Sequence, residues 1–310
     1  MSQIAFLFPG QGSQAAGMGK ALAENFPVAK SIFEQADEAL DFPISKLCFE
    51  GPDDQLRLTQ NTQPALLTVS IAAYAVLAEL GHQPAVVAGH SLGEYSALVA
   101  AGALDFADAV RLVRNRGKYM QEAVPPGVGA MAAILKPPLD QFEAILAAAA
   151  QGEIVSAANF NSPDQMVIAG HAGAVARACE ALKAAGAKRT VPLPVSAPFH
   201  CALMQPAQQR LLADLEATQF SDLRVPLINN IAAIEVNHGV DARQGLYLQV
   251  PGAVRWTDSM RALAARGITK AVEVGVGAVL CGLMRQIEPN LKTAKFGEPA
   301  DLEKLNELFN

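Results

Sequence analysis

Short apolar runs of strand length alternate with helix-length segments along most of this chain, and this alternation limits the possible folds more than any other feature. Ile4 to Phe8 is one such run, ended by Pro-Gly, and Ala85 to Gly89 is a second. Helical patterns run from about Gly19 to Leu40, from Pro64 to Leu80 and from Leu104 to Ala123. Strands that alternate with helices in this way predict an α/β fold on a parallel, doubly wound sheet.

The pattern changes after the double proline at 125–126. A strand, a helix, two strands, a helix and a last strand are predicted in that order up to Val195. This βαββαβ order is that of ferredoxin-like domains. The α/β pattern then resumes, with strands expected at Val225 to Asn229 and Lys270 to Val274. We therefore expect a discontinuous large domain, residues 1–126 and 197–310, that contains an inserted small domain, residues 127–196.

Composition excludes several classes of protein. The chain has 310 residues, of which 51% are hydrophobic and 17% charged, so it has enough apolar surface to form a core. Its net charge of −6 argues against a general nucleic-acid binder. The longest apolar stretch, Ala65 to Ala78, is too short to cross a bilayer, and no signal-peptide pattern is evident. Four scattered cysteines without a C-x-x-C pair favour a reduced compartment. We expect a cytoplasmic protein that binds neither nucleic acid nor membranes.

The strongest chemical motif is the G-x-S-x-G run from Gly89 to Gly93, which follows a predicted strand and precedes a predicted helix. A sharp strand-to-helix turn at this point would lift Ser91 clear of the sheet as a nucleophile. The main-chain N–H of Leu92, at the helix N-terminus, would face an oxyanion that forms on the attacked carbonyl. The alternative is a glycine-serine turn without catalytic meaning.

A serine nucleophile needs a base, and the chain offers five histidines: His82, His90, His171, His200 and His238. His200 lies where the small domain returns to the large one, and clefts between domains are common places for active sites. We therefore favour His200 as the base. His238, in a polar Asn-His-Gly turn, is the rival, and a structural role for His200 stays open.

Arg116 lies on the apolar face of a predicted helix, together with Leu112, Val113 and Met120. A guanidinium there needs an anion, because it cannot lose its proton. The anion is either an internal carboxylate such as Glu94 or the carboxylate of a substrate, which Arg116 would bind with two hydrogen bonds.

The loop from Phe8 to Gln14 contains a glycine pattern that partly fits a dinucleotide-binding fingerprint. That fingerprint requires a second strand ending in an acidic residue about twenty positions further on, where this chain is helical. We reject the nucleotide interpretation. The loop is better placed to bring the N–H of Gln11 toward Ser91.

Segments along nearly the whole chain resemble those of the malonyl-CoA:acyl-carrier-protein transacylase family, in family order. These segments are FPGQGSQ (8–14), TQPALLTVSIA (62–72), GHSLGEYSALVAAGAL (89–104), RGKYMQEAVPPGVGAMAAI (116–134), NFNSPDQMVIAG (159–170), APFHCALM (197–204), VRWT (254–257) and EVGVGAVLCGL (273–283). The resemblance implies an α/β-hydrolase-like large domain with a parallel sheet and an inserted ferredoxin-like small domain.

The resemblance also implies a role for each matching residue. Ser91 would be the nucleophile and His200 its base, Arg116 would bind the malonyl carboxylate, and the N–H groups of Gln11 and Leu92 would form the oxyanion hole. The main-chain carbonyl of Gln249 would orient the histidine. Phe199 and Asn161 would line the pocket, and Leu92 and Phe199 are typical of malonyl-selective members.

The reaction implied is a ping-pong transfer of malonyl from malonyl-CoA to the phosphopantetheine thiol of a holo acyl carrier protein, for fatty-acid synthesis. It needs no metal or other cofactor, and we expect a monomer. The chain departs from the family at Ala253, usually proline, which bears on the shape of the loop that carries Gln249. It also departs at Ala278, often lysine, which bears on carrier docking. Other candidate docking positions are Lys183, Lys188, Arg189 and Arg285.

Three alternatives remain open at this point. A serine thioesterase or other hydrolase would need a triad acid after Ser91 in the chain, and the candidates are Asp105, Asp108, Asp140 and Asp164. A malonyl-transferring subunit of a malonate decarboxylase would carry similar motifs. The third alternative is a non-catalytic interaction subunit, which the joint presence of Ser91, His200 and Arg116 disfavours.

Overall fold

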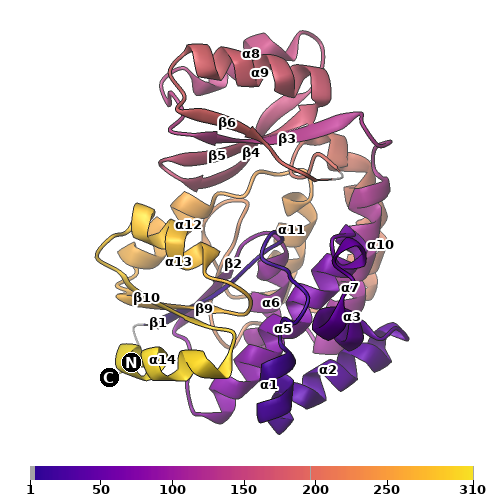
Figure 1. The fold of residues 1–310 in the computed structure, drawn as a ribbon, viewed down its shortest axis with the longest axis vertical. Helices are drawn as coiled ribbons and strands as arrows, with labels where there is room; N and C mark the ends of the chain where they lie inside the picture. Colours follow the sequence, from indigo (N-terminus) through magenta and orange to yellow (C-terminus); the bar gives the residue numbers. More distant parts are fainter. Residues whose placement is uncertain (1–3, 196, 310) are drawn as a thin grey trace.

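The structure is a computed structural model that describes residues 4–195 and 197–309. Within these residues, a six-stranded and a four-stranded sheet form the centres of a large and a small body, and Figure 1 shows the small body above the large one. No helix in the described part of the chain combines the length and the apolar character that a membrane crossing requires.

The large sheet has the strand order β10-β9-β1-β2-β7-β8, and all its pairs are parallel except that of β7 with β8. Its strands are β1 (Ile4–Phe8), β2 (Val86–Gly89), β7 (Leu227–Ile228), β8 (Glu235–Val236), β9 (Lys270–Val274) and β10 (Lys292–Phe296). Every residue of β1 is buried, because helices cover both faces of the sheet. Phe6 and Phe8 pack into the apolar cluster on one face, and Leu7 packs into the cluster on the other.

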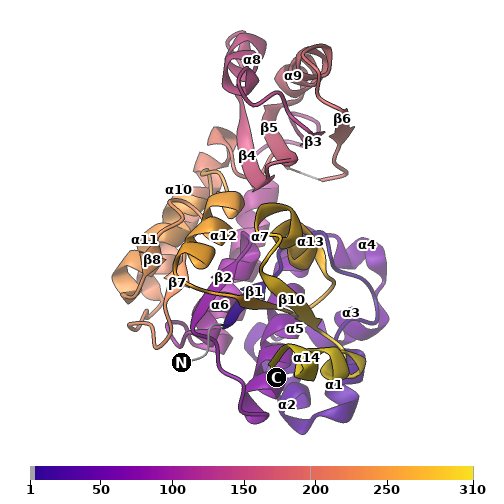
Figure 2. The same ribbon diagram turned by 90° about the vertical axis from the view of Figure 1, so that its left-hand side faces the viewer.

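The helices of the large body lie on both sides of this sheet (Figures 1 and 2). Before the small body come α1 (Lys20–Asn25), α2 (Pro27–Leu40), α3 (Ile44–Glu50), α4 (Asp53–Leu56), α5 (Thr59–Glu79), α6 (Leu92–Ala100) and α7 (Phe106–Glu122). After it come α10 (Gln205–Ala217), α11 (Gly239–Gln249), α12 (Trp256–Ala265), α13 (Val279–Ile287) and α14 (Leu302–Phe309), with short 3-10 helices at Ala202–Met204 and Pro299–Asp301.

The small body is an antiparallel sheet of order β4-β5-β3-β6 with two helices on the face away from the large body (Figure 2). Its elements are β3 (Gly129–Leu135), α8 (Phe142–Ala150), β4 (Val155–Ser162), β5 (Gln165–His171), α9 (Ala172–Ala184) and β6 (Arg189–Pro192). This is the expected ferredoxin-like arrangement, and the expected fold class is confirmed. The exact domain boundaries remain our proposal.

Main-chain hydrogen bonds join the two bodies. The N–H of Phe160 donates to the carbonyl of Val254 at 2.9 Å, and the N–H of Val254 donates to the carbonyl of Ala158 at 2.9 Å. These bonds occupy part of the outer edge of β4, and they place this strand directly above the carboxyl ends of β1 and β2, where the candidate site lies.

The single helix expected from Gly19 to Leu40 is two helices. Phe26 adopts an extended conformation between α1 and α2, and Pro27 begins α2. Proline disfavours a helical conformation in the residue before it and is well tolerated at the first helical position, so Pro27 both ends one helix and begins the next.

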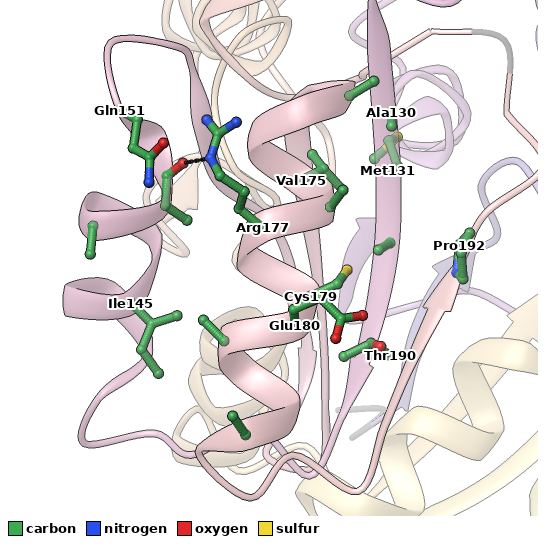
Figure 3. A pocket seen from close by; sticks show the side chains of 17 residues that line it. Ala130, Met131, Ile145, Gln151, Val175, Arg177, Cys179, Glu180, Thr190 and Pro192 are labelled. Carbon is green, nitrogen blue, oxygen red and sulfur yellow. Dashed lines mark hydrogen bonds between the residues drawn. The ribbon is translucent and has the colours of Figure 1, made fainter.

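A cavity of about 1180 Å³ lies in the small body, lined by α8, α9, β3 and β6 (Figure 3). Its lining is mostly alanine and other apolar side chains. Arg177 reaches from α9 and donates hydrogen bonds to the carbonyls of Ala149 and Ala150 at the end of α8. None of the sequence-predicted site residues lines this cavity.

Candidate active site

The turn between β2 and α6 carries Ser91 in a strained conformation, with φ 51° and ψ −106°. The glycines on either side make this turn possible. A Cβ added at Gly89 would overlap the main chain of Gly93, and a Cβ added at Gly93 would overlap the carbonyl oxygen of Phe8. The G-x-S-x-G spacing is therefore a packing requirement of this elbow.

Replacing Gly93 with Ala should destabilise the folded protein, because α6 and β1 must separate to admit the added methyl group. We expect the free energy of unfolding to fall by about 3 kcal/mol or more, at or above the upper end for overpacked cores. Urea denaturation of the variant measures this. Gly282→Ala, also in a helix but with no atom close to the added Cβ, is the control and should be at least as stable as the wild type. Equal stability of the two variants would contradict this account.

Asn230 holds the elbow in place from the turn that follows β7. Its Oδ1 accepts a hydrogen bond from the N–H of Ser91 at 2.7 Å, and its Nδ2 donates to the carbonyl of Gly89 at 2.7 Å. Asn230 is fully buried. The sequence does not single out Asn230, and its only signal there is its position directly after the strand predicted at Val225 to Asn229.

The hydroxyl of Ser91 lies 2.7 Å from Nε2 of His200, within hydrogen-bond distance. Nδ1 of the same ring lies 3.0 Å from the carbonyl oxygens of Gln249 and of Gly252. His200 also has a positive φ of 58°. Because both carbonyls accept, Nδ1 carries the proton and Nε2 is left free to accept one from Ser91. This is the geometry that a general base needs.

Burial, together with the positive charge of Arg116, lowers the pKa of His200 from its ordinary value of 6.5 to about 3. The imidazole therefore stays neutral at neutral pH and is ready to accept a proton. The unfolded chain binds a proton here below about pH 6.5, whereas the folded chain does not. This residue therefore makes the folded state less stable as the pH falls from about 6.5 toward 3.

Side-chain NMR of the imidazole tests this shift. We expect the His200 resonances, assigned by their loss in a His200 variant, to stay constant from about pH 8 to about pH 5, where an ordinary histidine titrates. A titration midpoint near 6.5 would contradict the account of the buried neutral base.

Arg116 lies on α7 with its guanidinium beside the pair. Its Nη2 donates to Oγ of Ser91 at 3.1 Å and to Oε1 of Gln249 at 2.8 Å, and its Nη1 donates to Oε1 of Gln63 at 2.7 Å. Arg116 is 2% exposed, and its guanidinium also lies against the ring of Tyr95. Burial lowers the pKa of Arg116, yet an arginine stays charged at neutral pH.

Glu94, the internal carboxylate considered above, forms no ion pair with Arg116 in the described residues. Uncharged amide oxygens hold the guanidinium instead. Nε of Arg116 has no hydrogen-bond partner within the described part of the chain. A buried positive charge without a paired anion is chemically suited to bind an anionic group of a ligand.

The two candidate oxyanion donors lie at adjacent strand ends. Phe8 pairs with Gly89 across β1 and β2, and the main-chain N–H of His90 donates to the carbonyl of Phe8 at 3.0 Å. Leu92 begins α6, so its N–H points out of the helix N-terminus. Among the described residues, neither the N–H of Gln11 nor that of Leu92 has an acceptor. Both groups are therefore available to a ligand.

Asn161 and Phe199 are each next to a residue of this centre in the structure or in the sequence. Oδ1 of Asn161, on β4, is 2.9 Å from Nε2 of His90, so this pair connects the small body to the elbow. Phe199 packs into the large apolar cluster next to His200. The His90 ring also contacts the ring of Trp256.

The other histidines lie elsewhere. His82 stacks on Phe309, His171 accepts a hydrogen bond from the N–H of Ile154, and His238 is paired with Asp222 at the surface.

No carboxylate of the described residues lies within hydrogen-bond distance of His200. Asp105 caps α7, Asp108 pairs with Arg111, and Asp140 and Asp164 are exposed. No cluster of three or more His, Cys, Asp or Glu side chains that could hold a metal ion occurs in the described ranges. The glycine loop after β1 is not followed directly by a helix, since α1 begins only at Lys20. This geometry does not favour dinucleotide binding.

An elbow serine beside a neutral buried histidine, on a parallel sheet of an α/β-hydrolase-like domain, defines a serine enzyme of the acyl-transfer class. Comparison with known proteins agrees. The acyl transferase domain family matches residues 5–293. The malonyl CoA-acyl carrier protein transacylase of Escherichia coli (strain K12) is 49% identical over 311 residues, which cover 99% of this chain and 100% of that protein. The chain therefore belongs to the acyl transferase family, among its malonyl CoA-acyl carrier protein transacylases.

Solved structures give the same result. An acyl carrier protein S-malonyltransferase from Vibrio cholerae has a TM-score of 0.96 and 46% identity, covering 98% of this chain and 100% of that one. A malonyl-transacylase in complex with a type II PKS acyl-carrier protein has a TM-score of 0.96 and 45% identity, covering 99% of each chain.

Proposed function

We propose that this chain transfers a malonyl group from malonyl-CoA to the phosphopantetheine thiol of a holo acyl carrier protein, through a malonyl ester on Ser91, for fatty-acid synthesis. The observation that carries the proposal is the buried guanidinium of Arg116, 3.1 Å from Oγ of Ser91 and without a paired carboxylate in the described chain. Malonyl carries its carboxylate one methylene away from its thioester carbonyl. The charge of a bound malonyl group would therefore lie close to the attacked carbon.

In the first half-reaction, Nε2 of His200 takes the proton of Ser91 as its Oγ attacks the thioester carbonyl. The N–H groups of Gln11 and Leu92 donate to the oxyanion of the tetrahedral intermediate. The carbon–sulfur bond then breaks, and the imidazolium returns its proton to the leaving thiolate of CoA. Malonyl-Ser91 remains, and Arg116 holds its carboxylate.

In the second half-reaction, the same imidazole takes the proton of the carrier's thiol, and the sulfur attacks the ester carbonyl. The bond from Oγ to the carbonyl carbon breaks, and Ser91 recovers its proton from His200. The carbonyls of Gln249 and Gly252 keep the ring oriented in both steps. These carbonyls take the orienting place that a carboxylate holds in a hydrolase triad.

The absence of a carboxylate beside Nδ1 in the described residues favours a transferase over a serine hydrolase. The acceptor assignment follows the relatives, whose names specify an acyl carrier protein. It is favoured over a malonate decarboxylase subunit for the same reason. We further propose that the protein acts in the cytoplasm as a monomer. Exposed positions near which a carrier could dock include Lys183, Lys188, Arg189 and Arg285.

A product assay tests the proposed function. The protein is incubated with excess malonyl-CoA, with and without holo acyl carrier protein, and free CoA, malonate and malonyl-carrier are quantified over time. We expect one equivalent of CoA per chain without the carrier, and continuous malonyl-carrier formation with it. Steady release of malonate in both reactions would identify a hydrolase instead.

A further inference from the structure

Behind Ser91, the side chains of Glu94, Asn230 and Gln249 form a buried hydrogen-bond network that the Ser–His pair does not include. Glu94 is 1% exposed, and the other two are fully buried. The three residues come from α6, from the segment after β7 and from the last residue of α11. The donors and acceptors of these side chains determine how the Gln249 carboxamide is oriented.

The orientation of the Gln249 carboxamide is determined by its neighbours. Arginine can only donate, so the atom that faces Nη2 of Arg116 at 2.8 Å must be the carboxamide oxygen. The amide nitrogen then faces acceptors only: the carbonyl of Ser91 at 3.1 Å, Oε2 of Glu94 at 2.9 Å and Oδ1 of Asn230 at 3.4 Å. Turned by 180°, the carboxamide would put an N–H₂ group against the guanidinium.

Glu94 is the ionisable member of the network, and one of its oxygens joins the other two residues. Its Oε2 accepts from Nε2 of Gln249 and from the main-chain N–H of Asn230 at 3.0 Å. Its Oε1 has no hydrogen-bond partner among the described residues. Any proton on this carboxyl can therefore reside on Oε1, so Oε2 accepts both bonds in either protonation state.

We propose that Glu94 is a positioning residue that fixes the carboxamide of Gln249, and that this carboxamide holds Arg116 in place for the substrate carboxylate. The main-chain carbonyl of Gln249 meanwhile orients His200, so one residue connects the base to the carboxylate grip. The inference rests on the proposed function, because it assigns Glu94 to the recognition of malonyl. Glu94 acts through Gln249 and touches neither the substrate nor the reacting atoms.

The test is the ratio of kcat/KM for malonyl-CoA to that for acetyl-CoA, which lacks the carboxylate. This ratio does not depend on the fraction of correctly folded enzyme, so a merely structural role would leave it unchanged. We expect Glu94→Leu to lower the ratio at least tenfold, through a higher KM for malonyl-CoA. Ser96→Ala is the matched control, because Ser96 is buried in the same helix and its hydroxyl has no partner among the described residues. Its ratio should equal that of the wild type.

Two further variants keep the test decisive if Glu94→Leu fails to fold. Gln249→Met keeps the main-chain carbonyl and removes the carboxamide, and it should lower the ratio to a similar extent. Glu94→Gln retains an acceptor oxygen, so its ratio should stay within about threefold of the wild type. In a double-mutant cycle, Glu94→Leu should lower the ratio little further in the Gln249→Met background, because both changes remove the same interaction.

An unchanged ratio in Glu94→Leu or in Gln249→Met, with a wild type that prefers malonyl-CoA, would overturn this inference alone. Additive effects of the two changes would also overturn it. A wild-type protein that shows no malonyl preference would overturn the proposed function, and this inference with it.

Discussion

Replacing Ser91 with Ala is expected to abolish the acyl-enzyme and to slow malonyl transfer to the carrier protein by at least about 10⁴-fold, as for other nucleophiles of covalent catalysis. The reason is geometric, because the hydroxyl 2.7 Å from Nε2 of His200 is the group that attacks. The rate of malonyl-carrier formation measures the loss. Replacing His200 with Ala should give a loss of comparable size, and the double variant should be no slower than the slower single one, because the two residues act as a unit.

Cys201→Ser is the control for the His200 change. Cys201 follows the histidine and is buried, its thiol donates to the carbonyl of Pro198 at 3.1 Å, and burial raises its pKa to about 11. A serine there keeps the donor, so malonyl transfer should continue at a near wild-type rate. Normal transfer by Ser91→Ala, or a large loss in Cys201→Ser, would show that the nucleophile has been misassigned.

Replacing Arg116 with Ala is expected to reduce kcat/KM for malonyl-CoA far more than for acetyl-CoA. Removing one partner of a buried charge pair costs about 2–5 kcal/mol. At about 1.4 kcal/mol per tenfold, this corresponds to a loss of roughly 30- to 4000-fold with malonyl-CoA. Acetyl-CoA has no carboxylate to lose, so we expect its kcat/KM to change by less than about tenfold. Steady-state kinetics with both substrates measure the difference.

Arg114→Ala is the matched control on the same helix. The Arg114 guanidinium lies over the ring of Phe42 at 4.4 Å, away from the Ser–His pair. Its removal should affect both substrates equally. An equal loss with malonyl-CoA and acetyl-CoA in Arg116→Ala would contradict the carboxylate-binding role, because it would indicate damage to the site as a whole.

The alternation of strands and helices was sufficient to predict the fold class, since local periodicity reports which segments are buried on one face or two. The βαββαβ order likewise predicted the small antiparallel sheet. The break at Phe26 was missed, although Pro27 signals it. Beyond Pro198, the strand expected at Val225 to Asn229 is present as β7, although β7 has only two residues. The neighbouring β8 was not predicted, because its two residues are too few to show a period.

Part of the candidate site could also be predicted from the sequence, and part could not. Ser91 and Leu92 lie within one local motif, and His200 and Arg116 are unusual side chains in their own surroundings, so sequence alone singled them out. Gln63 and Asn230 were not assigned to the site, and Glu94 was considered only as a partner anion for Arg116. Gln63 and Asn230 are common polar residues on separate segments, and only the folded chain brings them beside Ser91 and Arg116. Glu94 is close to Ser91 in the sequence, but its bonds to Asn230 and Gln249 also form only in the folded chain. Their roles depend on which donors face which acceptors, and no pattern in the sequence encodes that.

The central claim is that Ser91 carries the malonyl group between the two substrates. Intact-mass measurement within seconds of mixing with malonyl-CoA, followed by peptide mapping, tests it most directly. The account predicts one malonyl group per chain, located on the peptide that contains Ser91, and its complete loss once holo acyl carrier protein is added. A chain that acquires no mass, or that carries the group on a different residue, would contradict it.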